Sequence, residues 1–181
     1  EQLRLAMVWQ GKFADPGGVW RSQGHGTVRP LSRNVIRFAP GPDLDDAKSP
    51  WVVDEGRPPQ HRFKGYVLDQ QRRPVFSYDF DDFTVTDYFV DAVDSKSLQP
   101  LLRRTLTLQS KQSDRHVSFR AADSEEIARG DDGTFRIGKT LKVRIVSDQT
   151  GQVVDTESGK QLQVPLDTNE PSSTLVLEYL W

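Results

Sequence analysis

Hydrophobic and polar residues alternate on both sides of a polar turn between Arg62 and Phe80, a stretch that reads RFKGYVLDQQRRPVFSYDF. A period of two is typical of a β-strand with one face toward a core. The pattern predicts Phe63, Gly65, Val67 and Asp69 on one face and Arg62, Lys64, Tyr66 and Leu68 on the other. After the turn, Phe76, Tyr78 and Phe80 alternate with Val75, Ser77 and Asp79. The stretch therefore predicts a hairpin whose aromatic side chains face a core.

Further short strand patterns occupy much of the chain. The predicted strands cover residues 3–9, 34–38, 84–90, 101–109, 116–120, 134–137, 141–147, 152–155, 161–166 and 174–180. Turn residues separate the later ones, for example Asp131-Asp132-Gly133. The pattern also predicts one short helix, Ser124 to Arg129, which Asp123 or Ser124 would cap.

The first sixty residues are rich in loop signals. Residues 11–30 carry clusters of glycine, and five prolines lie between residues 40 and 59. Prolines at this density do not fit central strands, because each removes a donor from the ladder. This part predicts an ordered surface loop with a short helical turn near Leu44 to Lys48.

Many short strands with almost no helix predict an all-β fold, a two-sheet antiparallel β-sandwich with long decorated N-terminal loops. A closed barrel is the alternative. The chain of 181 residues suits a single domain, 1–181, in which residues 1–60 wrap around the main strands of residues 61–181. The start at Glu1, without an initiator Met, predicts a segment of a longer or processed protein.

Composition excludes several classes of function. The net charge is only −2, so the chain lacks the basic excess that nucleic-acid binding requires. There are no cysteines, which excludes disulfides, thiolate metal sites and a Cys nucleophile within the chain. No apolar run approaches the roughly 20 residues of a membrane span. We therefore expect no cofactor and no metal in this chain, no nucleic acid as a partner and no membrane span.

Catalytic signals are weak. His25, His61 and His116 stand apart, without the spacing of a metal motif. Aspartates cluster around residues 43–46, 79–82 and 131–132, where calcium binding and paired-acid catalysis both compete with ordinary turn chemistry. Turn chemistry is the simpler interpretation, and it predicts no catalytic residues.

Two tryptophans in the loop-rich part provide the best candidate for a ligand site. An exposed indole beside charged groups can stack on a sugar ring, while a buried one would plug the end of a sandwich. His25 lies between two glycines that allow close approach of the backbone. The candidate ligand-binding residues are Trp20, Arg21, His25, Trp51, Asp54, Arg57 and His61.

Three stretches carry a family resemblance: LAMVWQGKFADPGGVW, IRFAPGP and QHRFKGYVLDQQRRPVFSYDF. They resemble a segment of large secreted proteins of planctomycetes and related bacteria. Those proteins are similar to PQQ-type sugar dehydrogenases combined with haem-binding c-type cytochrome domains. The resemblance covers about residues 3 to 90. The chain lacks the Cys-x-x-Cys-His haem motif, so no haem ligand is carried over.

The resemblance implies a periplasmic or extracellular, cytochrome-associated protein with several domains. It favours a non-catalytic accessory or binding module that contacts neighbouring domains, with carbohydrate as a candidate ligand. One alternative is a carbohydrate-active hydrolase, lyase or epimerase that uses His25 or His61 with aspartates. A second alternative is a purely structural spacer between domains.

Overall fold

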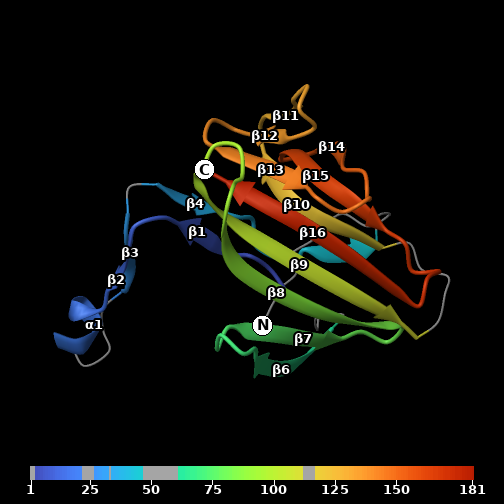
Figure 1. The fold of residues 1–181 in the computed structure, drawn as a ribbon, viewed down its shortest axis with the longest axis horizontal. Helices are drawn as coiled ribbons and strands as arrows, with labels where there is room; N and C mark the ends of the chain where they lie inside the picture. Colours follow the sequence, from blue (N-terminus) through green and yellow to red (C-terminus); the bar gives the residue numbers. More distant parts are fainter. Residues whose placement is uncertain (1–2, 22–26, 33, 47–60, 112–116) are drawn as a thin grey trace. The chain divides into compact units, whose positions relative to one another are not determined.

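The computed structural model describes residues 3–21, 27–32, 34–46, 61–111 and 117–181. The chain forms two compact units (Figure 1). The main unit contains Glu1–Arg4 and Pro40–Trp181, and the smaller unit contains Leu5–Ala39. We refer to these as the main unit and the N-terminal unit.

The main unit is built on an eight-stranded antiparallel sheet with the order β11-β12-β13-β16-β9-β8-β7-β6. Its strands are β6 (Arg62–Leu68), β7 (Pro74–Asp79), β8 (Phe83–Val93), β9 (Pro100–Ser110), β11 (Ile127–Arg129), β12 (Phe135–Ile137), β13 (Leu141–Ile145) and β16 (Ser172–Leu180). The long strands β8 and β9 pair along their whole length, from Phe83 opposite Ser110 to Val93 opposite Pro100.

A second sheet of four strands has the order β14-β15-β10-β5. Its strands are β5 (Leu44–Asp46), β10 (Val117–Ser124), β14 (Gln152–Thr156) and β15 (Gly159–Leu166). All pairings in it are antiparallel, and a bulge between Arg120 and Ala122 shifts the register of β10 against β15.

The two sheets pack face to face, which confirms the predicted all-β sandwich (Figure 1). Alternate residues of the large sheet, such as Leu106 on β9 and Leu177 on β16, are completely buried. From the opposite sheet, Phe119 and Val164 are equally buried. The hydroxyl of Tyr179 on β16 donates to the carbonyl of Ala121 on β10, at 3.2 Å, and so crosses the interface. The alternation with a period of two in the sequence therefore corresponds to the buried and the exposed faces of the large sheet.

The β6–β7 hairpin forms as predicted, but the predicted faces of β6 are wrong. The register shifts between Phe63 and Gly65, where Gly65 has a positive φ of 106°. This bulge adds one residue to β6, so Phe63 opposite Tyr78 and Tyr66 opposite Phe76 lie on the same face. A strict alternation cannot anticipate such a shift.

The N-terminal unit consists of two small ribbons and a short helix. Strand β1 (Met7–Trp9) pairs with β4 (Val35–Arg37), and β2 (Lys12–Asp15) pairs with β3 (Arg29–Leu31). Helix α1 (Gly17–Arg21) stands where the sequence predicts only loop. The backbone N–H of Gly17 donates to Asp15 Oδ1 at 2.8 Å, and Pro16 follows that cap. An aspartate cap followed by proline is a helix start signal. The prediction missed it because the glycines that follow favour a loop.

Both helices predicted for the main unit are wrong. Leu44 begins strand β5, and residues 47 and 48 lie outside the described residues. Ser124 ends strand β10, and its Oγ accepts the backbone N–H of Glu126, so the expected cap forms a tight bend instead. Ile127 then enters β11 opposite Ile137 and is buried. Within the described residues, no helix has the length and apolar character of a membrane span.

Candidate functional site

The structure describes two of the predicted ligand-binding side chains. Trp20 lies on α1 of the N-terminal unit, and His61 lies at the start of β6 in the main unit. The backbone of Arg21 ends α1. His25, Trp51, Asp54 and Arg57 lie outside the described residues. The predicted cluster as a set therefore stays a prediction.

His61 is buried within a group of aromatic rings. Its imidazole lies 5.6 Å from the ring of Tyr78, edge-on, and 5.3 Å from the ring of Phe80. Phe80 in turn stacks on Phe83 at 4.4 Å. Burial also raises the pKa of the Tyr78 hydroxyl to about 12. The imidazole thus fills the edge of the sandwich core, and the described residues contain no group of three metal-ligating side chains around it.

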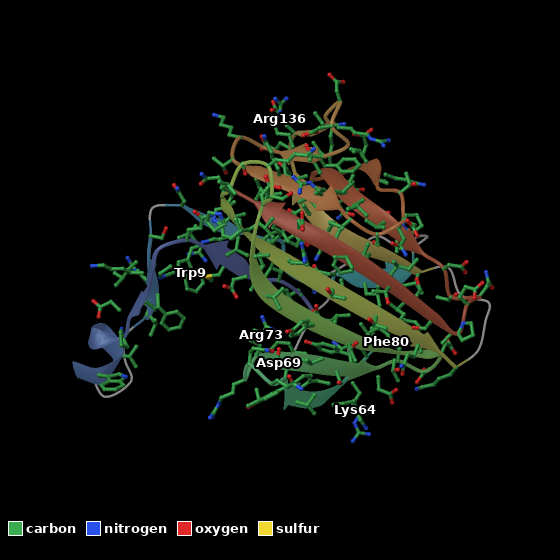
Figure 2. The ribbon with its side chains drawn as sticks, viewed as in Figure 1. Trp9, Lys64, Asp69, Arg73, Phe80 and Arg136 are labelled. Atoms are coloured by element: carbon green, nitrogen blue, oxygen red, sulfur yellow. The ribbon has the colours of Figure 1, made fainter. Side chains whose placement is uncertain are left out.

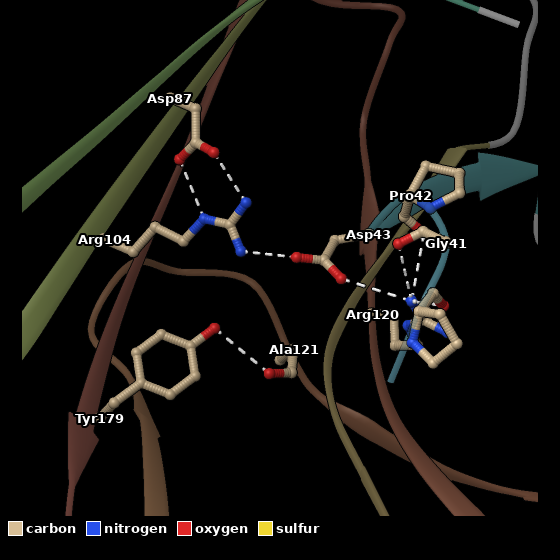
Figure 3. Close-up of polar contacts among 9 residues, drawn as sticks. Gly41, Pro42, Asp43, Asp87, Arg104, Arg120, Ala121 and Tyr179 are labelled. Atoms are coloured by element: carbon tan, nitrogen blue, oxygen red, sulfur yellow. Dashed lines mark hydrogen bonds and ion pairs between the residues drawn. The ribbon is translucent and has the colours of Figure 1, made fainter. Parts of the chain in front are cut away.

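A network of buried charges lies between the two sheets (Figure 3). The guanidinium of Arg104, on β9, is fully buried and donates to both carboxylate oxygens of Asp87 on β8, at 2.9 and 2.7 Å. Its third contact is Asp43 Oδ2, at 2.8 Å, just before β5. Burial opposes the charge of Arg104, but the carboxylates of Asp87 and Asp43 hold its pKa well above the ordinary value.

A second arginine completes this network at the end of the small sheet. Arg120 Nη2 donates to the carbonyl oxygens of Pro40 and Gly41, at 3.0 and 3.1 Å, and lies 3.5 Å from Asp43 Oδ1. Two arginines therefore face two aspartates. The ring of Phe119 lies 4.9 Å from the Arg104 guanidinium carbon. This network of buried, mutually paired charges fixes how the two sheets and the 40–43 segment pack together.

The sequence gives one signal for this network that the prediction missed. Asp87 and Arg104 stand at inward positions of their strands, where Val85 and Leu106 are also buried. Fully buried charges require partners. Charged residues in the inward register of two paired strands therefore indicate an internal ion pair.

A cross-strand row of charges lies on the other face of the large sheet. Arg103, Glu178 and Arg144 stand directly opposite one another on β9, β16 and β13. Glu178 Oε1 accepts Arg103 Nη2 at 2.6 Å, and Oε2 accepts Arg144 Nη1 at 2.8 Å. Arg144 also reaches Asp94 Oδ1, at 2.9 Å, beyond the end of β8. Hydrogen bonds from Ser97, and then from Arg144, hold the pKa of Asp94 well below its usual range.

A shallow cavity of about 250 Å³ lies beside the short β11–β12 hairpin. Its lining consists of Glu126, Ile127, Ala128, Arg136 and Lys160. Lys160 forms an ion pair with Asp155. The other ionic residues of the lining, Glu126 and Arg136, are exposed. The cavity lining therefore has none of the buried, convergent polar groups that are typical of a substrate pocket.

The N-terminal unit exposes several large apolar side chains among its described residues. Trp20 is 84% exposed and Phe13 is 80% exposed, and Val28 and Leu31 are about half exposed. Trp9 is held in place, because its indole N–H donates to the carbonyls of Lys12 and Phe13, at 3.2 and 3.0 Å. We call Phe13, Trp20, Val28 and Leu31 the N-terminal apolar set. All four belong to one small unit, residues 5–39.

No family model, curated protein or solved structure matches the chain.

Proposed function

We propose that the chain is a non-catalytic binding module of a larger exported redox protein, and that its N-terminal unit docks onto a neighbouring domain. The observation that carries the proposal is the exposure of Trp20 and Phe13. An exposed indole offers a large and rigid apolar surface to a partner, so the exposure of Trp20 favours a contact role. The family resemblance of residues 3 to 90 supplies the exported, cytochrome-associated setting.

The size of the N-terminal unit supports the same conclusion. Units below about 40 residues rarely form a sufficient core without disulfides, metals or a partner. The chain has no cysteine, and residues 5–39 fall below this limit. Burial of the N-terminal apolar set against a partner would contribute the missing stabilisation, at about 25 cal/mol per Å² of apolar surface.

Photocrosslinking of the full-length protein in its host would test the docking role. Replacement of Trp20 by a photoreactive phenylalanine derivative should give a crosslink to another domain of the same protein, identified by mass spectrometry. The control places the same group at Glu157, an exposed turn residue of the main unit. No crosslink at position 20, or equal crosslinking at position 157, would contradict the proposal.

Carbohydrate binding is the second candidate function, favoured by the same exposed indole of Trp20. Affinity electrophoresis against a panel of soluble polysaccharides would measure it. If the indole stacks on sugar rings, one polysaccharide should retard the chain, and Trp20→Ala should abolish the retardation while Trp9→Phe retains it. Unretarded migration with every polysaccharide would leave the protein-docking role alone.

A further inference from the structure

The outer edge of β6 differs from the other sheet edges of the main unit. Among the described residues, no strand pairs with β6 on the side away from β7. Tyr66, Val67 and Leu68 are 60%, 66% and 51% exposed, and they follow one another in the chain. An exposed edge of apolar residues is a template for another strand, because its backbone N–H and C=O groups point into solvent.

The other three edges carry the usual protection against strand addition. Strands β5 and β11 have only three residues each, and β5 contains two aspartates. Strand β14 carries Asp155 in an ion pair with Lys160. Strand β6 is longer, with seven residues, and its charged residues Arg62 and Lys64 and the bulge at Gly65 all lie before Tyr66. The three residues from Tyr66 to Leu68 lack any such device.

Hydrogen bonds to Asp69 organise the turn after β6, where Figure 2 shows Asp69 and Arg73. Asp69 Oδ1 accepts the backbone N–H groups of Gln71 and Arg73, both at 2.8 Å. Its Oδ2 accepts Arg73 Nε at 2.9 Å and the hydroxyl of Tyr88, on β8, at 2.5 Å. On β6 itself, Tyr66 lies edge-on to Phe76, with 6.0 Å between ring centroids. A preorganised edge loses little conformational entropy when a strand is added.

Charges at the two ends of the edge define the kind of strand that fits. Arg62 and Lys64 are exposed at one end, and Arg72 is exposed at the other. Asp79, the register partner of Arg62, is engaged by Lys111 at 2.6 Å. The edge thus has an apolar centre between two positive ends.

These charges disfavour a second copy of the chain as the occupant. Antiparallel pairing of β6 with itself brings the end of each copy that carries Arg62 and Lys64 toward the turn of the other copy, where Arg72 is exposed. Positive charges then gather at both ends of the pair, which disfavours it. A strand with apolar residues in its centre and carboxylates at its ends meets complementary charge at both ends instead.

We propose that the β6 edge is a strand-addition site for an extended peptide segment with an apolar centre and acidic ends. Main-chain hydrogen bonds to the edge provide affinity, contacts with Tyr66, Val67 and Leu68 provide the apolar burial, and Arg62, Lys64 and Arg72 select the acidic ends. This site is independent of the N-terminal apolar set.

Fluorescence anisotropy with a labelled synthetic peptide tests the proposal. The probe alternates valine and threonine and has aspartate and glutamate at both ends. We expect saturable binding that weakens with added salt and is lost when alternate peptide amides are N-methylated. The same peptide with lysine ends should bind about tenfold more weakly, which corresponds to about 1.4 kcal/mol.

Matched variants locate the binding to the β6 edge. Val67→Glu places a carboxylate in the centre of the edge and should weaken binding about tenfold, with Leu68→Glu as a second variant. Val153→Glu, on the β14 edge of the other sheet, should leave binding unchanged. Circular dichroism melting confirms that each variant folds.

Three outcomes would overturn the proposal. The first is equal affinity for acidic-ended and lysine-ended peptides, or affinity that Val67→Glu and Leu68→Glu leave unchanged. The second is sedimentation of the wild-type chain as a dimer that Val67→Glu converts to a monomer, which would make a second copy the occupant. The third is slow hydrogen exchange, without peptide, of those β6 amides that point away from β7, which would mean that the edge is already covered.

Discussion

Single residues in the interior show how charge is used in this fold. Arg104 and Asp87 stand where neighbouring residues are apolar, and each is almost completely buried. Their bidentate contact and the third bond to Asp43 compensate for the loss of hydration. The network therefore acts as a unit, and removal of one member leaves a buried charge without its partner.

Replacement of Asp87 should reveal this dependence. Asp87→Ala leaves Arg104 with one carboxylate inside the sandwich, and we expect a loss of about 3–5 kcal/mol in the free energy of unfolding. Urea denaturation followed by tryptophan fluorescence would measure it. Lys160→Ala, which breaks the exposed pair with Asp155, serves as the control and should change stability by less than about 1 kcal/mol. A loss for Asp87→Ala as small as that of the control would refute the structural role of the network.

At the scale of elements, one carboxylate organises the β6–β7 turn. Asp69 accepts hydrogen bonds from two backbone N–H groups and two side chains, and the Arg73 guanidinium lies 5.4 Å from the centre of the Tyr88 ring. The Tyr88 hydroxyl, followed by the backbone and side chain of Arg73, lowers the pKa of Asp69 to about 2. The turn therefore depends on an ionised aspartate.

The stability of the fold at acidic pH should depend on the ionisation of Asp69. A group whose pKa is lower in the folded state stabilises the fold above its unfolded pKa, and this contribution is lost as pH falls. For Asp69 the loss should occur as pH falls from about 4 toward about 2. Melting temperatures measured across this range should therefore decline less steeply for Asp69→Asn than for the wild type. Gln70→Ala, in the same turn, should keep the wild-type slope, and an unchanged slope for Asp69→Asn would contradict the assignment.

Some strands and turns can be predicted from the hydrophobic pattern, and others cannot. The hairpin and most strands after it can be predicted from period-two alternation. In a half-buried strand, the local order of apolar and polar residues shows which face is buried. The bulge at Gly65 breaks that rule, since one inserted residue reverses the faces before and after it. The predicted helix at Ser124–Arg129 fails for a different reason. Ser124 Oγ accepts the backbone N–H of Glu126 within a bend, so it does not cap a helix. Ile127 pairs with Ile137 in strand β11 and lies in the core.

At the scale of the main unit, the first residues of the chain are part of the sandwich. Leu3 is completely buried, and its carbonyl accepts the backbone N–H of Asp43 at 2.9 Å. The chain start is thereby tied to the segment that supplies Asp43 to Arg104 and Arg120. Residues far apart in sequence thus complete one core.

Truncation of this side chain should destabilise the whole main unit. Leu3→Ala removes buried methyl groups, and we expect a loss of about 2–5 kcal/mol in the free energy of unfolding. Leu98→Ala, at the exposed tip of the β8–β9 hairpin, should change it by less than about 0.5 kcal/mol. Chemical denaturation of both variants provides the comparison. Equal effects would show that residue 3 contributes nothing to the core.

The sequence by itself determined the all-β class and where most strands of the main unit lie along the chain, because alternation and turn residues are local signals. It also indicated Trp20 as a candidate ligand-binding residue, which stays a prediction. Only the tertiary structure decided that His61 packs among aromatic rings and that Arg104 contacts carboxylates on β8 and before β5. It also decided that, among the described strands, none pairs with the outer side of Tyr66–Leu68. Each of these depends on which strands become neighbours. Strand order follows from long-range packing of both sheets, and no local pattern encodes it.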